Sequence, residues 1–151
     1  MTGFAVSIQT AVFNALDGSA ELTALLANHE EFSRSGIYGF VPASAQSGNN
    51  SLFPLLTIGE DSPNDWSTDT ASGTEASVMV HVWSRSPGWS ECKKVADAVR
   101  DTLHRAELVT PDKAFIGMEW ESDEYVRDPD GITLHCAMQF RMIVDQEDFG
   151  E

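Results

Sequence analysis

The sequence predicts an α+β domain, in which a mainly antiparallel sheet has its helices packed on one face. Three observations lead to this prediction. Apolar residues recur at helical spacing near the N-terminus and again in the middle of the chain. Apolar and polar residues alternate in the last third, as expected of half-buried strands. Breaks rich in Pro, Gly and Asp separate these segments.

The N-terminal segment is expected to be helical. Its apolar residues follow at four-residue steps and form one stripe: Phe4, Ile8, Val12 and Leu16. Asp17-Gly18 is expected to end this helix, and Ser19 can cap a second short one that carries Leu22, Leu25 and Leu26. The pattern fits two short helices and one kinked helix equally well.

Two strands and two loops are expected next. The first strand covers Gly36 to Val41 and is ended by Pro42, and the second covers Phe53 to Glu60. The small polar residues at 43–52 predict a loop between them. Residues 61–74 predict a second loop, which is acidic, rich in Ser and Thr, and interrupted by Trp66.

A third strand and a helix follow. In the strand from Ala76 to Ser84, three valines face one way, and Met79, His81 and Trp83 face the other, so both faces are expected to be covered. Pro87-Gly88 turns the chain, and Ser90 can cap the helix. Its apolar face is expected to hold Cys92, Val95, Ala96, Val99, Leu103 and Ala106.

The last third predicts a hairpin. Ile116, Met118 and Trp120 alternate with Gly117, Glu119 and Glu121 before a turn at Arg127–Gly131. The return strand should point these residues inward: Ile132, Leu134, Cys136, Met138, Phe140, Met142 and Val144. Residues 145–151 are acidic and expected to be mobile. With no internal repeat and no long linker, residues 1–151 are expected to form a single domain.

Charge is the unusual property of the composition. Nine Lys and Arg stand against 24 Asp and Glu, which gives a formal net charge of −15 over 151 residues. Tight nucleic-acid binding needs a basic stripe, and none is present, but an acidic surface suits DNA that must slide past without adhering. No apolar run approaches the ~20 residues of a membrane span, and the first residues do not resemble a secretory signal. We therefore expect synthesis in the cytoplasm and no membrane partner.

A search for reactive groups yields only weak candidates. Glu119 and Glu121 share a strand face and could act as an acid–base pair, but solvated carboxylates are favoured. His81 and His135 could share a metal with Cys136 or Glu119, yet adjacent His135 and Cys136 point to opposite faces, so a packed or hydrogen-bonded histidine is favoured.

Cys92 stands near a helix start, where a thiolate is stabilised, but it lies on the apolar stripe and both cysteines are expected to be buried thiols. The glycines and serines form neither a phosphate-binding loop nor a nucleophile elbow. The sequence therefore predicts no enzyme, no catalytic residue, no metal and no cofactor.

Three tryptophans have polar neighbours. Trp66 follows Asp65 in an acidic loop, Trp83 precedes Arg85, and Trp89 follows a Pro-Gly turn. Tryptophan and arginine often anchor interfaces, although each of these tryptophans can equally cap the edge of its own core.

Five segments in order resemble the tail terminator, or tail-completion, proteins of siphophages and gene transfer agents. The segments are Gly36-Ile37-Tyr38 with Val41-Pro42, Phe53 to Glu60, Asp65-Trp66-Ser67-Thr68, Val80 to Arg85, and Arg127 to Gly131 with His135. The resemblance as a whole runs from about residue 4 to about residue 144. The loop at 43–52 and the acidic tail depart from the family's pattern. The resemblance implies an α+β subunit of a hexameric ring in the neck region of a virion tail, assembled in the host cytoplasm.

The same resemblance implies the partners. Such a ring caps the head-proximal end of the tail tube, stops its polymerisation, and joins the tail to the head. Its partners are other copies of itself, the major tail tube protein and the head-completion or stopper protein, and genome DNA passes through its lumen without specific binding. We expect subunit or partner contacts at Asp65, Trp66, Trp83, Arg85, Trp89, Arg127 and Asp128.

Three other hypotheses stay open at this stage. The chain could be a different head–tail joining protein, such as a stopper or connector, which would bind the portal or adaptor. It could be a soluble α+β binding module that uses Trp66 and Trp89 around a ligand. It could also be a hydrolase that uses Glu119 and Glu121.

Overall fold

A computed structural model describes residues 4–26, 36–38, 53–59, 68–69, 74–109 and 115–145. The elements within these ranges follow one another as α1 (Phe4–Asp17), α2 (Ala20–Leu25), β1 (Ile37–Tyr38), β2 (Leu55–Gly59), β3 (Thr68–Asp69), β4 (Thr74–Ser84), α4 (Ser90–Leu103), β5 (Glu107–Val109), β6 (Phe115–Arg127) and β7 (Leu134–Asp145). In the part of the chain described, no helix is long and apolar enough to span a membrane.

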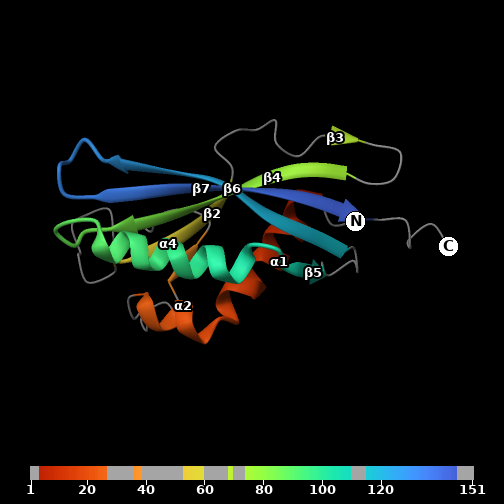
Figure 1. Ribbon diagram of the computed structural model, residues 1–151, viewed down its shortest axis with the longest axis horizontal. Helices are drawn as coiled ribbons and strands as arrows, with labels where there is room; N and C mark the ends of the chain where they lie inside the picture. Colours follow the sequence, from red (N-terminus) through yellow and green to blue (C-terminus); the bar gives the residue numbers. More distant parts are fainter. Residues whose placement is uncertain are drawn as a thin grey trace.

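The strands form one sheet in the order β1-β2-β4-β7-β6-β5, with β3 paired to β4. All pairings are antiparallel except β1 with β2, which is parallel. The three helices among the described residues lie on the same side of this sheet (Figure 1). The predicted fold class, a mainly antiparallel sheet with helices on one face, is confirmed. We call the opposite side of the sheet the helix-free face.

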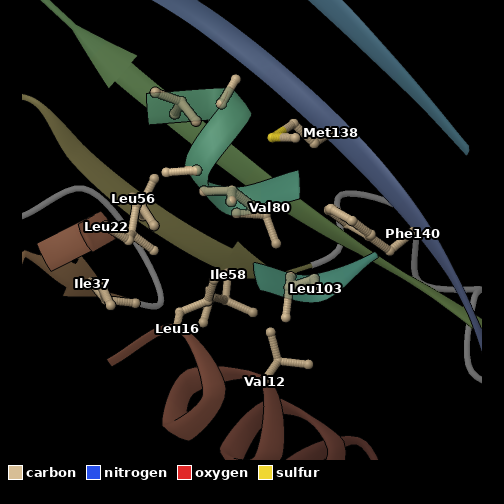
Figure 2. Packing of buried hydrophobic residues seen from close by; sticks show 14 of the residues in the cluster. Val12, Leu16, Leu22, Ile37, Leu56, Ile58, Val80, Leu103, Met138 and Phe140 are labelled. Atoms are coloured by element: carbon tan, nitrogen blue, oxygen red, sulfur yellow. The ribbon is translucent and has the colours of Figure 1, made fainter. Parts of the chain in front are cut away.

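The main core lies between the helices and the sheet. Val12 and Leu16 of α1 meet Ile58 of β2, while Leu103 of α4 lies close to Val80 and Phe140 on the central strands (Figure 2). All of these side chains are at most 2% exposed, and burying one such side chain contributes roughly 1.5–3 kcal/mol. The apolar periodicities of the sequence therefore converge on this layer.

The N-terminal alternative is resolved in favour of two helices. α1 ends at Asp17, and the Ser19 hydroxyl accepts a hydrogen bond of 3.2 Å from the Leu22 N–H as the cap of α2. The predicted capping of α4 is wrong, because Trp89 occupies the N-cap position without a side-chain hydrogen bond and Ser90 is already helical. α4 also ends at Leu103, so Ala106 is not part of its apolar face.

The strands differ from the prediction at several points. β3 and the first residue of β4 lie within the expected loop at 61–74, where Thr68 and Asp69 pair with Glu75 and Thr74. β5 was not expected, and it forms where the left-handed backbone of Arg105, at φ 64°, turns the chain back along β6. β7 ends at Asp145, the first residue of the expected mobile tail, and residues 146–151 lie outside the described ranges. Only residues 37–38 of the first predicted strand are seen as strand, and residues 39–41 are not described.

The β6–β7 hairpin contains a β-bulge that the alternation did not predict. The register shifts between Trp120 and Ser122, so that Glu121 is the extra residue. The shift lets Met118 and Trp120, and then Asp123 and Tyr125, all face the helices. Ile132 was predicted to point inward, but β7 begins only at Leu134 and Ile132 is 56% exposed.

Candidate assembly surfaces

The turn between β6 and β7, residues 128–133, is organised by one carboxylate. Asp130 Oδ1 accepts hydrogen bonds from the backbone N–H groups of Ile132 (2.9 Å) and Thr133 (2.8 Å), and Oδ2 accepts one from the Thr133 hydroxyl (2.6 Å). These hydrogen bonds hold the pKa of Asp130 below its usual value. Gly131 supplies the left-handed backbone at φ 79°. The turn therefore has a defined shape and presents Ile132 to solvent.

Arg85 ties this turn to the rest of the sheet. Its Nε donates a 2.9 Å hydrogen bond to the Thr133 hydroxyl, and its guanidinium lies 3.9 Å from Asp130. The same guanidinium sits over the Phe53 ring, 4.3 Å from the centroid. Because the side chain is only 10% exposed, these contacts within the subunit occupy most of its surface.

Trp83 is similarly engaged on the helix-free face. Its ring stacks on His135 with centroids 4.0 Å apart and 5° between the planes, and its Nε1 donates to the Thr57 hydroxyl at 3.1 Å. It also packs against Leu55, which is fully buried. For Trp83, the geometry favours the alternative that it caps the edge of its own core.

His81 and His135 are hydrogen-bonded to each other, which agrees with the expectation of packed or hydrogen-bonded histidines. His81 Nδ1 lies 2.6 Å from His135 Nε2, so one ring must donate its proton to the other. Cys136 points into the main core on the opposite face of β7. No cluster of three or more His, Cys, Asp or Glu side chains within the described ranges could hold a metal ion.

Trp89 lies at the other side of the sheet, near the start of α4. It packs against the main core and meets Tyr125 edge-on, with ring centroids 5.5 Å apart. Lys93 covers Tyr125 at 5.6 Å, and burial raises the pKa of the Tyr125 hydroxyl. Nearby, Arg127 is exposed, while partial burial and the charge of Asp130 raise the pKa of Asp128.

The exposed apolar side chains gather at the two ends of the β6–β7 hairpin. Tyr125 (36% exposed), Val126 (40%) and Ile132 (56%) lie at the end that holds the turn. Val109 (53%) and Ile143 (47%) lie at the opposite end, beside β5. Among the described residues, Leu25 on α2 is the one other large apolar side chain in this exposure class. We call the exposed apolar side chains at each end an apolar patch and treat the two patches as candidate interaction surfaces.

The end beside β5 carries a shallow open depression of about 290 Å³. Met118, which is 1% exposed, forms part of its apolar lining together with Ile143 and Gly117. Charged side chains complete the lining: Arg105, Glu107, Glu119 and Arg141.

The carboxylates considered for acid–base chemistry are exposed on β6. Glu119 lies 4.0 Å from Arg141, and Glu121 Oε1 accepts a 3.3 Å hydrogen bond from the Gln139 amide. Glu124 is also exposed further along the same strand, on the helix-free face. We call Glu119, Glu121 and Glu124 the acidic strip.

Both cysteines are free and buried in the main core, as the sequence predicted. Burial raises the pKa of Cys92 to about 12, with Glu91 adding to the effect, and burial likewise raises the pKa of Cys136 to about 12. Neither thiol is therefore activated as a nucleophile.

A family model described as "Tail completion protein gp17" matches residues 10–145. The chain belongs to the tail completion protein gp17 family. The match spans every described strand and most of α1, so the whole fold belongs to the family.

Individual relatives of this tail-completion protein agree with the family assignment. It is 21% identical to tail completion protein gp17 of Bacillus phage SPP1 over 98 residues, which cover 65% of this chain and 72% of the relative. The solved structure of SPP1 gp17 matches with a TM-score of 0.52 and 16% identity, over 93% of this chain and 90% of that one. A chain in the virion of a native gene transfer agent particle matches with a TM-score of 0.72 and 22% identity, over 96% and 99%.

The family settles the broad role. A tail-completion protein is a structural component of the virion, located in the tail or neck region, and not an enzyme. The hypotheses of a hydrolase and of an unrelated binding module are therefore set aside. The solved structures show the shared fold.

Five of the seven predicted contact residues lie in the described part. Trp83 and Arg85 meet the β6–β7 turn region, whereas Trp89 is near Tyr125 on the helix side, and Arg127 and Asp128 begin the turn. Asp65 and Trp66 lie outside the described residues. Sequence reasoning overlooked Val126, Ile132, Val109 and Ile143. Their exposure follows from where each strand starts and ends, which a periodicity cannot show.

Proposed function

We propose that this tail-completion protein is a tail terminator, which forms a ring on the head-proximal end of the tail tube. The ring stops tube polymerisation, receives the head-completion protein, and lets the genome pass. The observation that carries the proposal, beyond the family, is the placing of two unlike apolar patches at opposite ends of the β6–β7 hairpin.

Two unlike patches suit a ring better than a two-fold dimer. A two-fold interface is isologous and needs one self-complementary patch, whereas a cyclic ring joins one surface of each copy to a different surface of the next. A hexamer is the ring size that the family resemblance implies. The remaining surfaces above and below the ring are then available to the tail tube protein on one side and the stopper on the other.

The acidic strip supports the passage of DNA. Glu119, Glu121 and Glu124 are exposed on one strand of a chain whose net charge is already −15. Carboxylates that face a lumen repel phosphates, so DNA does not adhere to the wall during ejection. We assign the strip to the lumen side of the ring.

Deleting the gene tests the terminator assignment directly. Without a terminator, tube subunits should continue to add, so electron micrographs should show tails longer than normal that are not attached to heads. Supplying the wild-type gene in trans should restore both tail length and attachment. Tails of normal length that fail to join heads would instead favour the stopper or connector hypothesis. Normal virions would remove both.

A further inference from the structure

We propose that the β6–β7 turn of each copy seats in the depression beside β5 on the next copy. This inference rests on the ring proposed above and names the interface that closes it. The occupant of the depression is a second copy of this chain, and the contact is made by residues 128–132.

The two surfaces lie too far apart to meet within one copy. The turn lies at one end of the sheet and β5 at the other (Figure 1). β6, which connects the two ends, has 13 residues and therefore spans about 40 Å. The turn of one subunit can consequently reach only the depression of another, which is the head-to-tail arrangement of a cyclic ring.

The apolar parts of the two surfaces are complementary. Ile132 is 56% exposed, yet the three hydrogen bonds to Asp130 hold the backbone around it in place. The depression offers an apolar lining of Met118 and Ile143, with no side chain on Gly117 to narrow it. A preorganised turn loses little conformational entropy when it docks, so burying its isoleucine gives a net gain.

The depression is electrically neutral, unlike the chain as a whole. Arg105 and Arg141 stand beside Glu107 and Glu119 in its lining, and Arg141 lies 4.0 Å from Glu119. The whole chain has nine Lys and Arg against 24 Asp and Glu. A turn that carries Asp128 and Asp130 is therefore repelled less at this depression than over most of the remaining surface.

Site-directed disulfide formation tests the pairing. Ile132→Cys and Ile143→Cys are made in separate subunits, which are mixed, assembled and oxidised, in purified protein and in virion tails. We expect disulfide-linked dimers from the mixture and none from either variant alone. One chain carrying both substitutions should give a ladder that ends at the size of the ring. Leu25→Cys, which is also exposed but lies on α2, replaces Ile143→Cys in the matched control and should give none.

The possible outcomes distinguish a failure of the proposed interface from a failure of the proposed ring. Linked dimers from Ile132→Cys alone would show a turn-to-turn contact and overturn the inference. A ring visible on the tails, with no links in the mixture beyond those of the control, would overturn the inference and leave the proposed function standing. Tails without any ring of this protein would remove both.

A second variant measures the contact without oxidation. Ile132→Asp should weaken ring assembly at least tenfold, because it places a carboxylate in the apolar part of the contact, while Ile132→Leu should assemble normally. Circular dichroism confirms that the subunit is folded, which is expected because Ile132 lies outside the core. Equal assembly of both variants would contradict the inference.

Discussion

Single side chains decide the shape of the turn at the end of the hairpin. Asp130 accepts hydrogen bonds from two backbone N–H groups and from the Thr133 hydroxyl. Arg85, the residue after β4, donates a hydrogen bond to the same Thr133 hydroxyl. Arg85 was predicted as a contact residue, and its observed partners place it behind the turn as a support. The set of seven predicted contact residues stays a prediction, and Arg127 is the most exposed of the five that the structure describes.

Thiol chemistry at the residue scale gives a prediction. Burial raises the pKa values of Cys92 and Cys136 to about 12, so both remain protonated and covered in the folded protein. Iodoacetamide at roughly pH 8 should modify neither cysteine in native protein and both after unfolding, because the thiolate is the reactive form. Mass spectrometry of the two samples measures this. Rapid labelling of the native protein would show that the core around α4 opens readily.

At the scale of elements, the β-bulge in β6 has the largest consequence. Without the bulge, Glu121 would pair as a regular strand residue, and the alternation that buries Met118 and Trp120 would turn Asp123 and Tyr125 to the helix-free face. With it, Asp123 reaches Arg100 on α4 at 3.2 Å, and the Trp120 ring N–H donates to Asp123 at 2.6 Å. The bulge thus joins the distal half of the hairpin to α4.

The glycines of the hairpin allow a matched comparison. An added Cβ would meet nothing within 4 Å at either Gly131 or Gly117, but only Gly131 has a left-handed backbone, at φ 79°. Gly131→Ala should lower the free energy of unfolding by ~1–2 kcal/mol, the cost of that conformation for an L-residue. Gly117→Ala should be neutral or slightly stabilising, since alanine loses less backbone entropy in a strand. Urea unfolding at equal protein concentration measures both, and an equal loss in the two variants would contradict the role assigned to the turn.

At the scale of the whole molecule, the negative net charge opposes assembly into a ring. In the proposed hexamer, six copies of a chain with net charge −15 repel one another, so the ring needs local attraction where the copies meet. In the proposed interface, the neutral lining of the depression lowers this repulsion, and the burial of Ile132 supplies the attraction. Glu121 and Glu124 of the acidic strip lie on β6 outside the lining of the depression, and in the proposed ring they face the DNA.

Charge reversal on the strip tests the passage of DNA. Glu121→Lys with Glu124→Lys should slow genome release from virions at low ionic strength, because lysines on a lumen wall hold phosphates. The effect should shrink as salt rises, since the Debye length is only ~10 Å at 0.1 M. Glu21→Lys with Asp101→Lys, on exposed helical positions, is the matched control and should release at the wild-type rate. A similar delay in both double variants would argue against the strip as the lumen wall.

The core and the order of elements could be read from the sequence. The apolar stripes of α1 and α4 and the alternation of β4 and β7 depend on local spacing. Most of the described side chains that they select are buried, including Val12, Leu16, Val99, Leu103, Val80, Met138 and Phe140. The family resemblance was also present in the sequence, and the family assignment confirms it. Apolar spacing is a local property of the sequence, and the resemblance adds up over several segments, so both can be recognised without knowing the fold.

The spacing of apolar residues could not predict three features, which depend on the tertiary structure: β5, the β-bulge and the exposure of Ile132. β5 exists because Arg105 reverses the chain beside β6, and the bulge at Glu121 shifts a register that the alternation alone would continue. Ile132 fits the period of β7 but is exposed, because Asp130 holds the turn and pairing begins two residues later. The two apolar patches lie at opposite ends of the β6–β7 hairpin, because one patch is near the turn and the other is near the far ends of its two long strands. Sequence periodicity therefore selects which side chains are buried, and hydrogen bonding between strands decides where each burial stops.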